Sequence, residues 1–127
     1  MRILVVDDDS LAGQMTGAVL EEAGYDVVLA EDAIAAVQML NTDPAIGLVV
    51  SDMNMPMVSG IDLFCELRTQ GVNIPFILLT GDEPAILLAR EPRLNACLAK
   101  DCALEEYLPQ IVAGVLARQT GEGENGG

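Results

Sequence analysis

The sequence predicts a doubly wound α/β domain with a mostly parallel sheet and helices on both of its faces. Two observations lead to this prediction. Short and nearly continuous apolar runs recur along the chain, as is typical of parallel strands that are buried on both faces. Stretches with a helical spacing of apolar residues separate these runs, so that a β-α unit repeats about five times. The 127 residues, 51% of them hydrophobic, suffice for one domain with a real core.

The expected strands are short apolar runs, the second of which is less apolar than the others. Their length is typical of strands rather than of buried helices. We expect strands at residues 2–6, 26–30, 46–50, 74–79 and 95–99.

The expected helices lie between these strands and carry apolar residues three and four positions apart. We expect Pro84 to begin the fourth helix and Pro92 to end it early, because proline is tolerated only in the first turn of a helix. The last helical pattern covers residues 103–118. The apolar stripes of the first three helices are Leu11, Met15, Ala18 and Val19, then Ala33, Ala36, Val37 and Leu40, then Leu63, Phe64 and Leu67.

Residues with capping chemistry mark the expected helix ends. Ser and Asp side chains accept hydrogen bonds from the free N–H groups of a first turn, and glycine adopts the left-handed conformation that follows a last turn. After residue 118 the chain is rich in Gly and Glu, which predicts one domain over residues 1–118 and a flexible tail or the start of a linker over 119–127. We predict N-caps at Ser10, Asp32, Ser59 and Asp82, and helix ends at Gly24 and Gly71.

The charge balance and the missing residue types exclude several functions. The chain has 20 acidic and 6 basic residues and a formal net charge of −14. Nucleic acid and membrane surfaces are therefore not expected as partners, because Lys and Arg drive binding to phosphate. The chain has no histidine, so it can supply neither an imidazole base nor a phosphohistidine. The lack of a signal-peptide pattern, of a long apolar run and of paired cysteine motifs predicts a cytoplasmic protein.

Polar residues follow the expected strands at the point where each strand ends. Asp7 and Asp8 follow the first strand, Asp52 the third, Thr80 the fourth, and Lys100, the only lysine, the fifth. The carboxyl ends of the strands border the ligand crevice of an open α/β sheet. If the first and third strands are neighbours, three carboxylates converge, and a cation is needed to offset their repulsion. A set of oxygen ligands without His or thiolate favours Mg²⁺.

This set of groups can make and hold an aspartyl phosphate, since it combines a carboxylate nucleophile, Mg²⁺, a hydroxyl and a lysine. Phosphoryl transfer depends on charge stabilisation more than on a general base, so the missing histidine is no obstacle. The phosphate must then come from another protein or from a small phosphodonor.

Four segments carry a resemblance to a known family: Ile3–Asp9, the D-x-x-M-P-x-x-x-G stretch Asp52–Gly60, Leu79–Gly81, and Lys100. Over about residues 1–118 the chain resembles the receiver domain of bacterial response regulators (CheY-like). The resemblance implies a flavodoxin-like sheet of five parallel strands in the order 2-1-3-4-5. It also implies a phosphoprotein of two-component signal transduction that takes part in its own phosphorylation and dephosphorylation and is not otherwise an enzyme.

The resemblance implies Asp52 as the phospho-acceptor. It makes Asp8 and Asp52 direct Mg²⁺ ligands, with Asp7 acting mainly through water and the backbone carbonyl of Asn54 completing the protein's share of the metal ligands. The phosphodonor would be a phosphohistidine on a sensor histidine kinase or a histidine phosphotransfer protein. The output would be a downstream protein partner or an effector domain that lies outside this chain.

By the same resemblance, Thr80 and Lys100 bind the phosphoryl oxygens, and Gly81 is the small residue that leaves room for them. Asn54 and Asp82 would influence how fast the phosphate is hydrolysed.

Two positions depart from the family pattern. Members usually carry an aromatic residue three positions before the lysine, and here this position is Cys97. They usually have proline directly after the lysine, and here it is Asp101. Because the aromatic residue normally takes part in switching, Cys97 predicts an atypical output route.

Two alternative functions remain open from the sequence. A phosphatase of the haloacid dehalogenase type also has an apolar strand followed by D-x-D, which Asp7 and Asp9 satisfy, and it would make Asp7 the nucleophile. That alternative expects further acids after the lysine strand and leaves the motif at Asp52 unexplained. A receiver-like scaffold that binds a partner without phosphorylation is the second alternative; the complete set of acceptor, metal-binding acids and lysine argues against it, while Cys97 and Asp101 keep it open.

Overall fold

Strands and helices alternate throughout the chain, as the apolar pattern predicts. The computed structural model of the protein describes the backbone of residues 1–101 and 103–125 and the side chains of residues 1–101 and 103–118. The elements in chain order are β1 (Arg2–Val6), α1 (Ser10–Glu22), β2 (Asp26–Ala30), α2 (Ala33–Thr42), β3 (Ile46–Asp52), α3 (Gly60–Thr69), β4 (Phe76–Thr80), α4 (Pro84–Arg90), β5 (Ala96–Ala99) and α5 (Leu104–Asn125).

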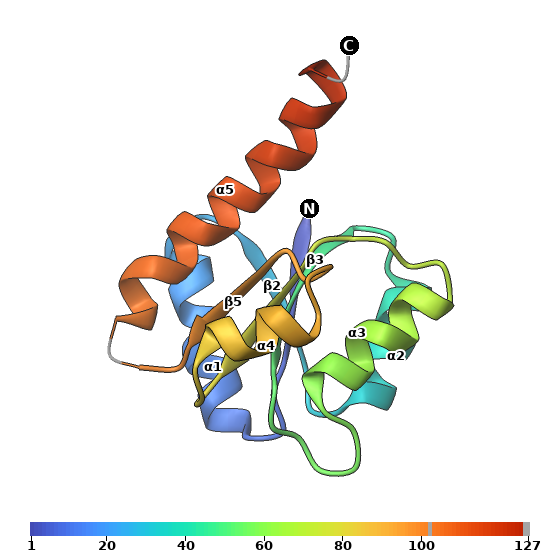
Figure 1. Ribbon diagram of the computed structural model, residues 1–127, viewed down its shortest axis with the longest axis vertical. Coiled ribbons are helices and arrows are strands. Elements are labelled where there is room, and N and C mark those ends of the chain that lie inside the picture. Colours follow the sequence, from blue (N-terminus) through green and yellow to red (C-terminus); the bar gives the residue numbers. More distant parts are fainter. Residues whose placement is uncertain (102, 126–127) are drawn as a thin grey trace.

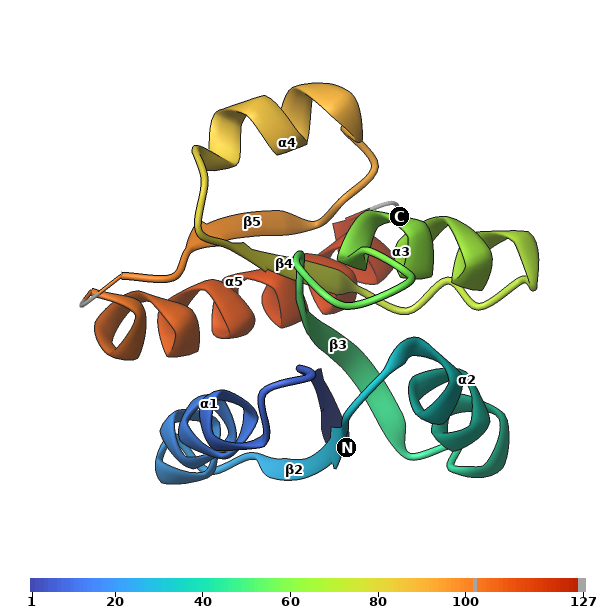
Figure 2. The same cartoon turned by 90° about the horizontal axis from the view of Figure 1, so that it is seen from below.

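The five strands form one parallel sheet in the order β2-β1-β3-β4-β5, so the predicted topology is confirmed. Helices α1 and α5 cover one face of the sheet, and α2, α3 and α4 cover the other (Figures 1 and 2). In β1, Ile3 and Val5 point toward α1 and α5, whereas Leu4 and Val6 point toward the opposite helices. The alternation that places successive side chains on opposite faces explains why these runs are apolar at every position.

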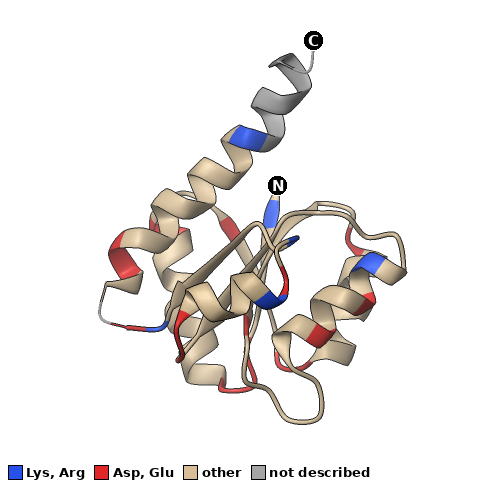
Figure 3. Ribbon diagram, viewed as in Figure 1, with Lys and Arg blue, Asp and Glu red and all other residues tan. Residues whose placement is uncertain are grey.

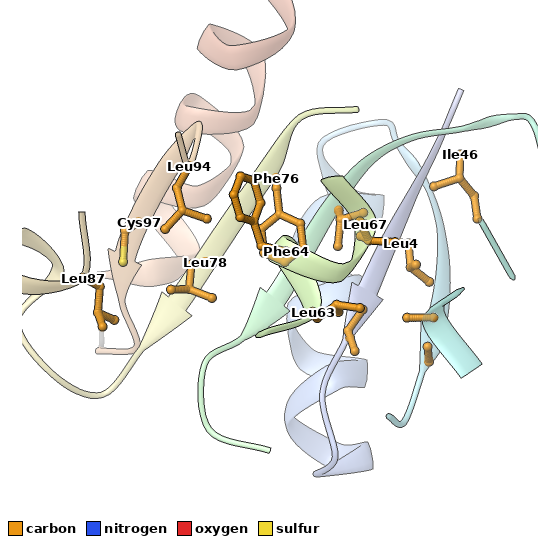
Figure 4. Packing of buried hydrophobic residues seen from close by; sticks show 14 residues of the cluster. Leu4, Ile46, Leu63, Phe64, Leu67, Phe76, Leu78, Leu87, Leu94 and Cys97 are labelled. Atoms are coloured by element: carbon orange, nitrogen blue, oxygen red, sulfur yellow. The ribbon is translucent and has the colours of Figure 1, made fainter. Parts of the chain in front are cut away.

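The core on the α2–α4 face contains both phenylalanines of the chain. The rings of Phe64 and Phe76 meet edge to face, with their centroids 5.3 Å apart. Figure 4 shows Leu87 of α4, Leu94 and Cys97 packed together at the β5 end of this cluster. None of the helices in the described part of the chain is long and apolar enough to span a membrane.

Two predicted N-caps are wrong by one residue. The cap of α1 is Asp9 rather than Ser10, and its carboxylate accepts hydrogen bonds from the N–H groups of Leu11 and Ala12. The N-cap of α4 is Glu83 rather than Asp82, because the backbone N–H of Asp82 donates to the Thr80 hydroxyl and holds Asp82 in the preceding loop.

The other predicted helix ends are confirmed. Asp32 caps α2, and Ser59 caps α3 in a reciprocal capping box with Asp62. Gly24 and Gly71 follow α1 and α3 with positive φ angles of 99° and 83°.

Several element boundaries differ from the predicted ones by a few residues. β3 continues to Asp52, and β4 begins at Phe76 rather than at residue 74 because Pro75 has no N–H to donate to a neighbouring strand. α4 begins at Pro84 and ends at Arg90, as the two prolines predict. The backbone of α5 remains helical to Asn125, beyond the expected end at residue 118.

Candidate functional site

Three carboxylates meet at the carboxyl ends of β1 and β3. Val6 of β1 is paired with Ser51 of β3, so the next residues of the two strands, Asp7 and Asp52, are neighbours. Asp7, Asp8 and Asp52 each offer one oxygen, and these oxygens lie within 4.8 Å of one another. The side chain of Asp8 is exposed, whereas Asp7 and Asp52 are only 4% and 6% exposed. The predicted convergence of the three acids is therefore confirmed.

Lys100 belongs to the same group, although it comes from the far end of the chain. Its Nζ lies 3.3 Å from Oδ2 of Asp7 and 3.4 Å from Oδ1 of Asp52. Its backbone N–H donates to the carbonyl oxygen of Thr80 at 2.7 Å, which fixes the start of the loop after β5 against the end of β4. One ammonium group thus faces two nearly buried carboxylates.

Burial and neighbouring charges shift the pKa values of Asp52 and Lys100. Burial raises the pKa of Asp52 above its ordinary value, and the charge of Asp7 adds to that shift, while Lys100 opposes it. Burial alone would lower the pKa of Lys100, but the charges of Asp52 and Asp7 and its hydrogen bonds to them raise it overall. The site therefore holds more negative charge than its one lysine can offset, which favours binding of a further cation.

The end of β4 supplies a hydroxyl and an open space. Thr80 is fully buried, and its hydroxyl oxygen accepts a hydrogen bond from the N–H of Asp82 at 3.0 Å. A Cβ atom added to Gly81 would meet nothing within 4 Å, so the chain leaves free space beside this residue.

The loop between β3 and α3 folds back onto the end of β3. The N–H of Asn54 points to Oδ1 of Asp52 at 3.4 Å, and the N–H of Gly60 donates to the carbonyl oxygen of Met53 at 2.9 Å. A Cβ atom at Gly60 would lie only 2.5 Å from Cδ1 of Leu78 and 2.6 Å from the carbonyl oxygen of Asp52. The glycine that ends the D-x-x-M-P-x-x-x-G stretch is thus required for this close approach.

Sequence reasoning missed two residues that hold the acids in place. The N–H of Asp9 donates to Oδ1 of Asp7 at 2.9 Å, and the hydroxyl of the fully buried Ser51 donates to the carbonyl oxygen of Asp52 at 2.9 Å. Ser51 is the only polar residue within the buried run before Asp52, and this position was the signal that could have identified it.

The two atypical positions lie outside this charged group. Cys97 is 8% exposed and belongs to the apolar cluster beneath α4, and burial raises the pKa of its thiol to about 11. Asp101 accepts a hydrogen bond from the N–H of Ala103 at 2.9 Å, and its carbonyl accepts one from Leu104. The residue that replaces the usual proline thus helps to begin α5.

The donor set fits a hard divalent cation. The group consists of three carboxylates without histidine or thiolate, and such oxygen donors are the ligands that Mg²⁺ and similar cations prefer.

Comparison with known proteins identifies the family. The model of the response regulator receiver domain matches residues 3–112. The response regulator MprA of Mycobacterium avium (strain 104) is 34% identical over 113 residues, which are 89% of this chain and 46% of the relative. MprA of Mycobacterium leprae is 34% identical over 122 residues, which are 94% of this chain and 52% of the relative. The chain therefore spans about half the length of the curated relatives that it matches.

Solved structures agree with this assignment. A response regulator receiver domain protein from Clostridium thermocellum superposes with a TM-score of 0.82 at 27% identity, covering 94% of this chain and 96% of that one. The response regulator protein TrrA from Thermotoga maritima, solved in complex with Mg²⁺-BeF, gives a TM-score of 0.79 at 27% identity, covering 90% and 97%.

These findings do not favour the two alternatives. The phosphatase would need Asp7 as a free nucleophile, but one oxygen of Asp7 accepts the N–H of Asp9 and the other faces Lys100. A scaffold without phosphorylation would leave the lysine and the three converging acids unexplained. The sheet order, the acidic group at the ends of β1 and β3, and the family match agree with one another, and the chain belongs to the response regulator receiver domains of two-component signalling.

Proposed function

We propose that this chain is a phosphorylation-controlled switch that accepts a phosphoryl group on Asp52 and thereby changes its binding to a partner protein. The observation that carries this proposal is the position of the Lys100 ammonium between Asp7 and Asp52, beside an exposed Asp8. This arrangement places a positive charge 3.4 Å from Oδ1 of Asp52, where the phosphoryl oxygens would lie.

A bound Mg²⁺ would offset the negative charge of the acids and of the incoming phosphoryl group. Asp8 and Asp52 would hold the ion directly, Asp7 mainly through water, and Asn54 through its backbone carbonyl. The complex of Mg²⁺-BeF with the similar TrrA protein supports this assignment for the present chain.

In the transfer step, a carboxylate oxygen of Asp52 forms a bond to phosphorus while the bond from phosphorus to the donor's histidine nitrogen breaks. Lys100 and the hydroxyl of Thr80 would bind the phosphoryl oxygens, with Gly81 leaving the space for them. The Thr80 hydroxyl oxygen accepts a hydrogen bond from the N–H of Asp82, which leaves its own proton to donate to a phosphoryl oxygen. Asp82 and Asn54 flank the phosphoryl group in this proposal and would influence its hydrolysis by the receiver itself.

The proposed partners are proteins. The donor would be a sensor histidine kinase or a histidine phosphotransfer protein in the cytoplasm, and the output a downstream protein or an effector domain outside this chain. We propose that the receiver domain comprises residues 1–118, with residues 119–127 as a tail or linker. The net charge of −14 supports protein partners over nucleic acid or a membrane. Cys97 supports an output route that differs from the aromatic switch typical of the family.

Incubation with Mg²⁺ and acetyl phosphate tests the proposal. The wild type, Asp52→Asn and Asp7→Asn proteins are compared by intact mass and by tryptic mapping. We expect one phosphoryl adduct in the wild type that maps to Asp52, none in Asp52→Asn, and a reduced yield in Asp7→Asn, which keeps the acceptor. An adduct on Asp7 would support the phosphatase alternative, and the lack of any adduct would support the scaffold.

A further inference from the structure

An apolar groove lies between α2 and α3, on a part of the surface that the phosphorylation site does not use. The two helices are neighbours on the same face of the sheet (Figures 1 and 2). The groove has a volume of about 490 Å³. Its apolar lining includes Ile34, Val37, Val58 and Leu63. We call this feature the α2–α3 groove.

Helix α2 contains no charged residue and exposes one large apolar side chain, that of Ile34. The sequence Ala33–Thr42 contains no Asp, Glu, Lys or Arg, although the chain as a whole is strongly charged. Only Ala36 is fully buried, and Ile34 remains 70% exposed. Gln38, Asn41 and Thr42 give α2 an exposed polar side, but the exposed Ile34 and the apolar groove beside it indicate a surface that a partner covers.

The opposite wall of the groove is acidic. Asp62 and Glu66 of α3 line the groove and lie four residues apart, which places them on one side of that helix. Figure 3 shows acidic positions along α3 in red. No Lys or Arg is among the described residues that line the groove. Arg68, further along α3, donates instead to the carbonyl oxygens of Val72 and Ile74.

This asymmetry selects the charge of the occupant. The α2 wall is uncharged, with Gln38 as its polar residue, whereas the α3 wall carries two exposed carboxylates, and no cation is among the described residues that line the groove. Asp62 accepts a hydrogen bond from the N–H of Ser59, and Glu66 accepts one from the side chain of Gln70, so both remain negatively charged acceptors. A ligand with an apolar face and basic residues along one flank complements both walls at once. A second copy of this chain would instead present the same acidic face, and the segment 119–127 contains two Glu and no large apolar residue. The occupant is therefore a different protein.

The lining also selects the conformation of the occupant. An extended peptide would bring its free N–H and C=O groups against apolar side chains, where they would lack hydrogen-bond partners. A helix satisfies these groups internally and presents apolar side chains at positions i, i+3, i+4 and i+7. The lining residues Ile34 and Gln38 on α2 are four positions apart, as are Asp62 and Glu66 on α3. Each wall is therefore about one helical turn long, which suits two or three such apolar anchors.

We propose that the α2–α3 groove binds an amphipathic helix of a partner protein, with its apolar face against Ile34 and Val37 and its Lys or Arg side chains facing Asp62 and Glu66. This surface does not depend on the phosphorylation chemistry at Asp52.

A designed peptide tests the proposal by NMR titration of the ¹⁵N-labelled protein. The probe is a helical peptide of about 14 residues with Leu at i, i+3, i+4 and i+7 and Lys along one flank. Its twin carries Glu in place of each Lys. We expect the Lys peptide to shift backbone signals within residues 33–38 and 58–66, and to bind at least tenfold more tightly than the Glu peptide.

Two pairs of variants separate specific docking from general attraction. Ile34→Ser should weaken binding of the Lys peptide about tenfold, while Ile86→Ser, which alters an exposed isoleucine on α4, should leave it unchanged. Glu66→Lys should weaken binding of the Lys peptide and strengthen binding of the Glu peptide. Glu21→Lys, with the same change in net charge, should change neither affinity by more than about twofold. Shifts centred on α1 and α5, equal effects of the two charge variants, or no binding at millimolar peptide would each overturn the proposal.

Discussion

The Nζ atom of Lys100 lies 3.4 Å from Oδ1 of Asp52, and the strand β4 separates the two strands from which these residues come. The same ammonium lies 3.3 Å from Oδ2 of Asp7. One partly exposed cation thus compensates two nearly buried anions. Because burial raises the pKa of Asp52 even with Lys100 present, the group is electrostatically unfavourable without a further cation.

Replacing the lysine should therefore destabilise the protein most strongly when no divalent cation is present. We expect Lys100→Met to lower the free energy of unfolding by about 1–2 kcal/mol at pH 7 in EDTA, since it leaves two carboxylates without a counter-charge. Urea denaturation followed by circular dichroism measures this change. Saturating Mg²⁺ should reduce the difference in free energy of unfolding between Lys100→Met and the wild type, because the ion offsets the charges of the same carboxylates.

Arg90→Met is the matched control, because it removes one positive charge from an exposed position on α4. We expect it to change the free energy of unfolding by less than about 0.5 kcal/mol. If both variants lose the same stability, the effect of Lys100 comes from net charge and not from its contacts with Asp7 and Asp52.

The close packing around Gly60 predicts a second effect on the site. Gly60→Ala should lower the free energy of unfolding by about 2 kcal/mol or more, because its Cβ would press on Leu78 and on the backbone of Asp52. It should also lower the yield of the acetyl phosphate adduct. Gly114→Ala in α5 is the control, because its Cβ meets nothing within 4 Å. This variant should raise the free energy of unfolding by about 0.5–1 kcal/mol, since alanine favours the helix over glycine. Equal stability of the two variants would contradict this account of Gly60.

The sequence is sufficient to predict the sheet and the meeting of Asp7, Asp8 and Asp52. Apolar runs locate the strands, and acids at the ends of neighbouring parallel strands must share one edge of the sheet. The cap of α1 was not predictable in the same way. Asp9 and Ser10 are adjacent and both cap helices well, and the choice depends on the N–H of Asp9, which Asp7 binds.

The contacts of the loop after α4 also escaped prediction. Glu91 and Arg93 form a two-pronged ion pair after α4, and the thiol of Cys65 on α3 lies 3.8 Å from Oε1 of Glu91. The guanidinium of Arg93 also lies over the ring of Phe64, 5.4 Å from its centroid. No periodicity or motif marks these residues, since their contacts depend on how the loop after α4 folds back onto α3.

This ion pair predicts a pH dependence of stability. The hydrogen bonds from Arg93 lower the pKa of Glu91 to about 2, against an ordinary value of 4.5. Folding thus favours the ionised carboxylate, so its contribution is complete above pH 4.5 and is lost as the pH falls toward 2. We expect Glu91→Gln to cost about 1 kcal/mol at pH 7, since Arg93 is largely exposed, and progressively less below pH 4.5.

Urea denaturation of both proteins between pH 7 and pH 2.5 measures this dependence. Glu106→Gln, at an exposed position in the first turn of α5, should show at most a small effect of the helix dipole. If Glu91→Gln lowers the free energy of unfolding by the same amount down to pH 2.5, packing and not the ion pair is responsible for the loss.

The buried thiol of Cys97 predicts slow chemical labelling of the native protein. Its pKa of about 11 leaves roughly a hundredfold less thiolate at neutral pH than the ordinary value of 9.0 does, and the side chain is covered by the cluster beneath α4. Cys65 on α3 is partly exposed and serves as the internal comparison. In a Cys102→Ser background, iodoacetamide at pH 7.5 should modify Cys65 at least tenfold faster than Cys97, as followed by tryptic mass spectrometry. In 8 M urea the two rates should converge, because the difference comes from the fold. Equal rates in the native protein would mean that α4 opens readily and exposes Cys97.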